Sequence, residues 1–285
     1  MRRVAQLVPV SDSDDPRVDD FRDLSRADRR PDRPGGRGLV IAEGVVVVER
    51  LLDSPYPVRA LMGVRGRLDS LAGALHQVDV RAYVVEADVM AQVVGFHLNR
   101  GVLAVADRAP APDLHRVLTE SRRLAVLEGI GDHENLGALF RNAAALGVDA
   151  VLLGPGCSDP LYRRSVRVSM GNVLRVPFAA LPNWPRDLQL LRDHGFRVAA
   201  LTPDADATPV RSAGLDRGKV AVLLGSEGPG LSEAALGAVD TAVGIPMHRD
   251  VDSLNVATAA AVTFYEMNAS PETGGPRPPV SEARA

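Results

Sequence analysis

Residues 219–232 read KVAVLLGSEGPGLS, an uninterrupted apolar run that ends in a glycine-rich turn. The apolar run over residues 219–225 is typical of a strand buried on both faces, as the strands of parallel sheets are. A proline between two glycines indicates a tight turn in which Ser226 and Glu227 are exposed. Ligands of parallel α/β sheets bind at the carboxyl ends of the strands, so this turn is a candidate binding loop.

Five further apolar runs are similar to this strand, and helical patterns separate them. The runs cover residues 124–128, 149–154, 173–178, 197–202 and 241–246. Strands that alternate with helices favour a parallel α/β sheet, and periodicity alone predicts an unknotted, doubly wound sheet. We place this domain at residues 121–267.

A smaller α/β unit is predicted ahead of this domain, at residues 38–107. Its helical patterns lie at 43–52, 68–77 and 89–94, and its strand patterns lie at 58–63, 80–86 and 101–107. Residues 108–120 contain alternating prolines and are predicted to be a linker. Residues 1–37 are dense in Arg and Asp and are expected to form a flexible extension with one short helix. Residues 268–285 are rich in Pro and Gly and are expected to form a disordered tail.

The composition narrows the function classes. A hydrophobic fraction of 46% in 285 residues supplies a real core and argues against global disorder. The net charge is −3, so a nucleic-acid site would be a local patch. A single cysteine, Cys157, suits a reducing compartment. Since no apolar run has the length of a signal peptide or a membrane span, we expect a cytoplasmic protein.

Two other loops follow predicted strands. In the first, Asn135 is expected to cap a helix, and Arg141 lies off that helix's apolar face. Gly137, one turn before Arg141, would leave open space beside the guanidinium, although a solvated helix arginine is the alternative. In the second loop, Ser253 and Asn255 lie where a helix begins, and simple capping is the alternative.

The segment at residues 157–172 reads CSDPLYRRSVRVSMGN, and Asp159-Pro160 is a typical helix beginning. One flank of this helix carries Arg163, Arg164 and Arg167. Arginine suits phosphate contact, so these residues form a candidate RNA-binding stripe. A solvated helix face is the alternative.

Taken in order, these segments resemble the SpoU/TrmH family of SPOUT methyltransferases. The resembling motifs are NLGALFRNAAALG (135–147), CSDPLYRRSVRVSMGN (157–172), LLGSEGPGLS (223–232) and IPMHRDVDSLNVATAAAVTFYE (245–266). The resemblance implies a parallel-sheet SPOUT domain with a C-terminal trefoil knot. Residues 38–107 look like the family's L30e-like substrate-binding domain, although the family's frequent His-Gln-Gly is replaced here by residues 97–101, HLNRG.

The resemblance also implies the activity: transfer of a methyl group from S-adenosylmethionine to a ribose 2′-hydroxyl of RNA. The implied catalytic residues are Asn135, Arg141, Glu227, Ser253 and Asn255. The implied cofactor-binding residues are Leu224, Gly225, Ser226, Gly230, Ile245, Met247, Ser253 and Leu254. A homodimer formed through the SPOUT domain is implied as well, with no metal ion and no membrane.

The role of Arg141 stays open at this stage. A guanidinium only donates hydrogen bonds, so it either acts as a strongly perturbed base or grips phosphate and stabilises the developing alkoxide. We expect rRNA rather than tRNA as substrate, because an L30e-like domain precedes the SPOUT domain. The alternatives are a SPOUT base methyltransferase and an inactive RNA-binding protein. A nucleotide-dependent oxidoreductase is disfavoured, because the chain has no G-x-G-x-x-G.

The family motif generates the first prediction. We expect Arg141→Ala to abolish methylation while the cofactor still binds, because this side chain is assigned to the 2′-hydroxyl and not to the cofactor. Transfer of labelled methyl groups and cofactor binding are measured on the same preparation. Unchanged turnover in the variant would overturn the assignment of Arg141.

Overall fold

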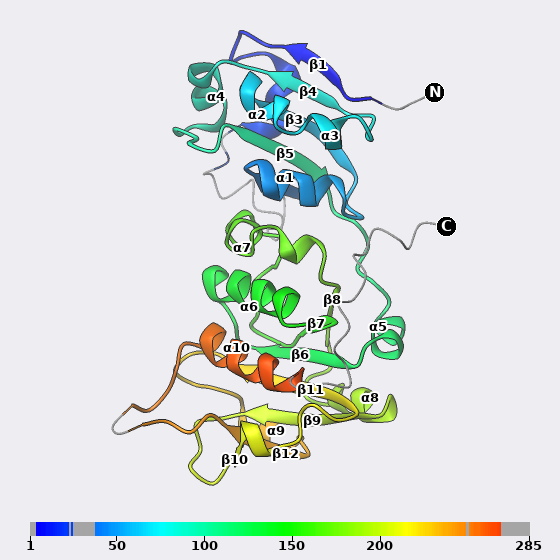
Figure 1. The fold of residues 1–285 in the computed structure, drawn as a ribbon, viewed down its shortest axis with the longest axis vertical. Coiled ribbons are helices and arrows are strands. Elements are labelled where there is room, and N and C mark those ends of the chain that lie inside the picture. The colour runs from blue at the N-terminus through cyan, green and yellow to red at the C-terminus, as the bar shows by residue number, and fades with distance from the viewer. Residues whose placement is uncertain (1–3, 23, 25–37, 249–250, 269–285) are drawn as a thin grey trace.

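The computed structural model describes residues 4–22, 24, 38–248 and 251–268. Figure 1 shows two sheets, each with its own helices, one above the other along the long axis of the molecule. The chain builds the upper sheet first and then crosses once to the lower sheet. The upper sheet contains strands from residues 6–9 and 39–107, and the lower sheet contains strands from residues 123–244.

The lower sheet has seven strands in the order β10-β12-β9-β11-β6-β7-β8, and all of its pairs are parallel. The strands are β6 (Arg123–Glu128), β7 (Ala150–Leu153), β8 (Phe178–Ala180), β9 (Phe196–Leu201), β10 (Thr208–Pro209), β11 (Lys219–Gly225) and β12 (Thr241–Gly244). Central β11 pairs with β6 on one side and β9 on the other. The predicted parallel α/β sheet is thereby confirmed.

One predicted strand of this sheet is wrong. Residues 173–178 were expected to be extended, but Val173 and Leu174 belong to the 3-10 helix η3 (Asn172–Leu174), and the strand begins only at Phe178. Val173 and Leu174 are buried in the core. A buried turn therefore produces the same apolar run as a buried strand.

Helices cover both faces of the parallel sheet. They are α5 (Leu114–Glu120), α6 (His133–Ala145), α7 (Arg163–Val168), α8 (Leu188–Asp193), η4 (Val210–Ser212), α9 (Glu233–Leu236) and α10 (Val256–Met267). Figure 1 shows α6 and α10 on the same side of the sheet, and the Asn142 side chain joins them by donating from Nδ2 to the Ala257 carbonyl at 2.7 Å. This pairing fixes where the last helix begins relative to the first helix of the domain.

The predicted linker at residues 108–120 is partly helical. Asp113 caps α5 by accepting a hydrogen bond from the Arg116 amide at 2.9 Å. Val117 and Leu118 of this helix are buried in the core of the parallel sheet. The prolines before Asp113 masked this short amphipathic helix in the sequence pattern.

The upper sheet is mixed and has the order β1-β4-β3-β5-β2. Its strands are β1 (Gln6–Pro9), β2 (Leu39–Glu43), β3 (Val58–Gly63), β4 (Arg81–Val84) and β5 (Val102–Asp107), and its helices are η1 (Pro16–Phe21), α1 (Val45–Leu52), α2 (Arg65–Asp69), α3 (Ala72–Leu75) and α4 (Ala87–Val94). The pattern at 58–63 predicted β3 to the residue. Strand β2 was missed, because its run LVIAE passes directly into the apolar helix α1.

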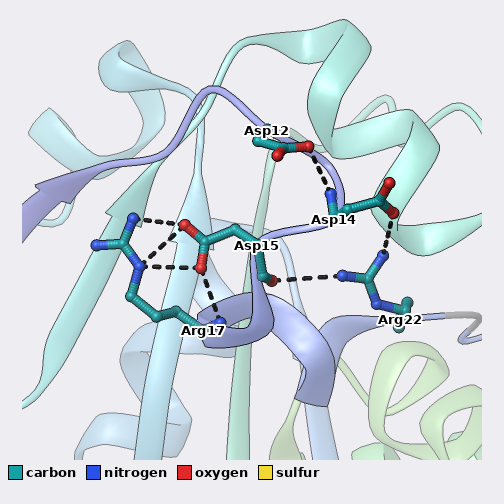
Figure 2. Close-up of polar contacts among 5 residues, drawn as sticks. All are labelled: Asp12, Asp14, Asp15, Arg17 and Arg22. Atoms are coloured by element: carbon teal, nitrogen blue, oxygen red, sulfur yellow. Dashed lines mark hydrogen bonds and ion pairs between the residues drawn. The ribbon is translucent and has the colours of Figure 1, made fainter.

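The prediction of a flexible extension over residues 1–37 is wrong for its described part. Strand β1 pairs with β4 in parallel register, and Val18 and Phe21 of η1 are fully buried. Figure 2 shows how Asp15 fixes the turn before η1: its carboxylate accepts hydrogen bonds from the amide and guanidinium of Arg17. The Arg17 side chain is the main reason that the pKa of Asp15 is lowered to about 2.

Arg22 closes the same turn from the other side. In Figure 2 its guanidinium lies against the Asp14 carboxylate at 3.7 Å and donates to the Asp15 carbonyl at 3.3 Å. The dense Arg and Asp content thus stabilises a fixed turn here, whereas in the sequence it suggested disorder. Residues 25–37 and the predicted tail at 269–285 lie outside the described residues.

The buried N-terminal segment generates the second prediction. We expect Phe21→Ala to lower the free energy of unfolding by about 3–5 kcal/mol, as for other fully buried aromatic residues. Val4→Ala is the control, because Val4 is 43% exposed and should change little. Denaturant unfolding measures both. A Phe21→Ala protein as stable as the Val4→Ala control would indicate that this segment is flexible, as the sequence pattern suggested.

Candidate active site

A cavity of about 360 Å³ opens at the carboxyl ends of β9, β11 and β12. All eight residues that the resemblance assigns to the cofactor line this cavity. They are Leu224, Gly225, Ser226, Gly230, Ile245, Met247, Ser253 and Leu254. Glu227 also lines it, so the loop after β11 and the loop after β12 meet at one cavity. The cavity lies at the edge of the sheet where the carboxyl-end rule for parallel sheets predicts a ligand site.

Backbone contact shapes the wall that follows β11. A Cβ atom added at Gly225 would lie 2.3 Å from the carbonyl carbon of Gly230 and 2.4 Å from the amide nitrogen of Leu231. The loop then closes on itself, because the Gly230 amide donates to the Ser226 carbonyl at 3.1 Å. Gly228 has a φ of 88°, a conformation that suits glycine. The glycines therefore allow two backbone segments to approach each other closely beside the cavity.

Three of the predicted catalytic residues form one hydrogen-bonded cluster. Glu227 Oε1 accepts from Asn255 Nδ2 at 2.6 Å and from Asn135 Nδ2 at 3.1 Å. Asn255 Nδ2 also contacts Asn135 Oδ1 at 2.8 Å. The Val256 amide points to the same Glu227 oxygen at 3.4 Å, so the carboxylate lies at the positive end of α10. The fold thus brings together three residues whose pairwise separations in the sequence are 28, 92 and 120 positions.

The two asparagines reach this cluster in different ways. Asn255 caps α10, the role given as the alternative to a site residue: its Oδ1 accepts from the Ala257 and Thr258 amides. Asn135 is not the cap of α6, because Asp132 takes that place and accepts from the amide of Asn135 at 2.9 Å. This hydrogen bond is the main cause that lowers the pKa of Asp132. With its capping role removed, the Asn135 side chain is free to bind Glu227.

Arg141 is exposed on α6 and is not among the residues that line the cavity. The expected open space at Gly137 does not exist. A Cβ atom there would lie 2.8 Å from Val168 Cβ and 2.9 Å from the Ser165 carbonyl oxygen. Gly137 instead lets α7 pack closely against α6. Arg141 therefore lies outside the lining of the cavity, on the same helix as Asn135.

The three arginines of the predicted RNA-binding stripe lie in different environments. Arg163 is half-buried against the upper unit, with its Cζ 4.9 Å from the centre of the Phe96 ring and its Nη1 3.9 Å from Glu43 Oε2. Burial lowers the pKa of Arg163, and Glu43 opposes that shift. Arg164 is exposed and donates to Glu134 at 2.5 Å, and Arg167 is half-buried. Arg163 thus joins the two units and does not extend an open stripe.

Sequence reasoning missed part of the cavity wall. The end of β9 contributes three residues to the wall of the cavity: Leu201, Thr202 and Pro203. The loop that follows β12 contributes Asp252. A signal for the first group was available. Residues 197–202 were predicted as a parallel strand, and its carboxyl end had to lie at the same edge of the sheet as that of β11.

The described residues contain no group of three or more His, Cys, Asp or Glu side chains that could hold a metal ion. In the same part of the chain, no helix is long and apolar enough to cross a membrane. The cavity offers apolar side chains, backbone groups of a glycine-rich loop and two carboxylates, Glu227 and Asp252. This donor set suits an uncharged or cationic organic molecule.

A comparison with solved structures shows that the fold of this chain is shared with a known protein. The AdoMet-bound rRNA methyltransferase from Sinorhizobium meliloti superposes with a TM-score of 0.76 over 92% of this chain and 98% of that one, at 23% identity. At that identity the similarity establishes a shared α/β fold.

The sequence comparisons then identify the family. Residues 122–265 match the SpoU rRNA Methylase family. An uncharacterized tRNA/rRNA methyltransferase of Mycobacterium tuberculosis is 55% identical over 94% of this chain and 93% of its own length. A 23S rRNA (guanosine-2′-O-)-methyltransferase of Acinetobacter baylyi is 30% identical over 78% of this chain and 94% of its own length. The chain belongs to the SpoU rRNA Methylase family, and the predicted family is confirmed.

The close contact at Gly225 generates the third prediction. We expect Gly225→Ala to lower the free energy of unfolding by at least about 1–3 kcal/mol, because an added methyl group would overlap fixed backbone atoms. Gly66→Ala in α2 is the matched control, since its new Cβ would have no atom within 4 Å. Chemical denaturation compares the two. Equal stability of both variants would contradict the close approach at Gly225.

Proposed function

We propose that this protein transfers a methyl group from S-adenosylmethionine to a ribose 2′-hydroxyl of RNA. The observation that carries the proposal is the position of Glu227. This residue lines the cavity formed by the eight expected cofactor residues, and it also binds Asn135 and Asn255. Cofactor pocket and polar cluster are therefore adjacent, as transfer between two bound molecules requires.

The cavity fits an adenosyl ligand. Leu224, Ile245 and Leu254 supply apolar surface for a flat ring, and the loop at Gly225 and Gly230 supplies backbone groups at close range. S-adenosylmethionine would bring an activated methyl group on a positively charged sulfur, so the protein needs no metal to activate it. Glu227 and Asp252 are the carboxylates of the lining that can face this positive charge.

The remaining polar groups are assigned to the RNA. Asn135, Glu227 and Asn255 are open to solvent or half-buried, so a ribose can reach them. Their fixed amide and carboxylate groups would orient the hydroxyl, with Ser253 beside them in the cavity wall. Arg141 lies exposed on the same helix as Asn135, where its guanidinium can bind a backbone phosphate or stabilise the developing alkoxide. We assign two further arginines, Arg164 and Arg167, to contacts with the RNA phosphates.

The finer architecture is part of the proposal. The chain leaves β12 beyond β9, and α10 returns across the sheet to pack beside α6, which supports a C-terminal trefoil knot at residues 241–267. The mixed upper sheet, which includes residues 38–107, supports an L30e-like substrate-binding domain. The SPOUT domain is assigned to residues 121–267, and the cytoplasm is assigned as the compartment.

A homodimer through the SPOUT domain is supported by α10. Val262 and Tyr265 on this helix are 37% and 63% exposed, which leaves apolar surface for a second copy. The substrate is assigned to rRNA rather than tRNA. The Acinetobacter baylyi relative is named for 23S rRNA, and the upper unit supplies a second α/β body beside the methyltransferase domain.

The fourth prediction tests the activity. We expect the protein to transfer labelled methyl groups from S-adenosylmethionine to total RNA from a strain that lacks its gene, and to transfer few to RNA from the parent strain. Nuclease digestion and mass spectrometry should find the label on a ribose. Label on a base would favour the base-methyltransferase alternative. Cofactor binding without transfer to either RNA would favour an RNA-binding protein.

A further inference from the structure

Glu128 is a buried carboxylate at the edge of the candidate cofactor site, and the family resemblance assigns it no role. It ends β6 and is 8% exposed. Its Oε1 accepts from Trp184 Nε1 at 2.6 Å and from Ser232 Oγ at 2.7 Å, and its Oε2 accepts from the Ser232 amide at 2.9 Å. A buried charge of this kind is retained only when its oxygens are well paired.

Ser232 is the point where the cofactor loop ends. Residues 226–231 form that loop, and four of its members line the cavity: Ser226, Glu227, Gly228 and Gly230. The Ser232 hydroxyl donates to Glu128 while accepting from the Ala235 amide at 3.2 Å, so it also caps α9. The carboxylate therefore fixes the loop at its far end and sets where the next helix begins.

The near end of the loop is fixed at the same level of the sheet. Gly225 is paired with Glu128 in the parallel register of β11 and β6. The chain that leaves β11 at Gly225 thus returns at Ser232 to Glu128, the residue paired with Gly225 in the sheet. Trp184 adds a third anchor, because its ring lies 3.1 Å from the position of a Cβ on Gly154, just beyond β7. Through its hydrogen bonds to Ser232 and Trp184, the Glu128 carboxylate thus connects the ends of β6, β11 and β7 next to the cofactor loop.

We propose that Glu128 is a positioning residue for cofactor binding, which holds loop 226–231 in the shape that lines the cavity. The inference rests on the proposed function, because it takes this cavity to be the S-adenosylmethionine site. Glu128 touches neither substrate in this scheme. Its effect passes through the Ser232 amide and hydroxyl to the backbone of the loop.

Glu128→Gln tests the proposal because it keeps the size of the side chain and removes one acceptor oxygen. The new amide group would face a donor, either the Ser232 amide or the pair of Trp184 Nε1 and Ser232 Oγ. We expect the Kd for S-adenosylmethionine, measured by calorimetry, to rise about tenfold or more. In methyl transfer to total RNA from the deletion strain, KM for the cofactor should rise in parallel, with kcat at saturating cofactor within about twofold.

Glu120→Gln is the matched control. It makes the same substitution at an exposed ion pair with Arg116 on α5, and it should leave Kd, KM and the melting temperature unchanged. Ser232→Ala is the second variant, in case Glu128→Gln does not fold. It removes the hydroxyl contact to Glu128 together with the α9 cap, keeps the amide contact, and should raise the Kd by a smaller factor.

The outcomes separate the two hypotheses. An unchanged Kd in both Glu128→Gln and Ser232→Ala, with normal binding by the unaltered protein, would overturn the role of Glu128 alone. A fall of kcat and melting temperature without a change in KM for the cofactor would also overturn it, since that pattern describes general destabilisation. Failure of the unaltered protein to bind S-adenosylmethionine would overturn the proposed function and this inference together.

Discussion

The backbone contact between Gly225 and Gly230 is the constraint on which the rest of the site depends. The chain leaves the central strand of a parallel sheet and turns back within six residues, so closely that a single methyl group would not fit. This turn directs Glu227 toward the beginnings of α6 and α10. Asn135 and Asn255 can then share one carboxylate oxygen. Without the tight return, the side chains of three separate loops would not meet.

Much of the site could be predicted from the sequence, because it depends on short, local patterns. The run at 219–225 predicted β11 to the residue, and the rule that ligands bind at carboxyl ends of parallel strands placed the three loops at one edge. The position of Asn255 before an apolar helix left a helix cap and a site residue both open, and the structure shows the cap together with the contact to Glu227. The contact between Glu227 and the asparagines was not predicted from local pattern, since it joins residues far apart in the chain.

The errors have a common physical origin: sequence pattern reports burial better than it reports backbone conformation. Val173 and Leu174 are as buried as predicted, but in a 3-10 turn and not in a strand. Asn135 was assigned a cap that Asp132, three residues earlier, provides. The space expected beside Arg141 is filled by α7, an element whose packing on Gly137 no local pattern could reveal.

Strand β1 carries a consequence for how the protein is handled. It covers one side of β4 from Gln6 to Pro9, although the surrounding residues look dispensable in the sequence. A shortened chain that began at residue 38 would lose the edge strand β1, and β4 would become the open edge, with its amide and carbonyl groups on that side unpaired. Such edges recruit strands from other molecules. Self-association of shortened preparations would then reflect the missing strand and would say nothing about how the intact protein assembles.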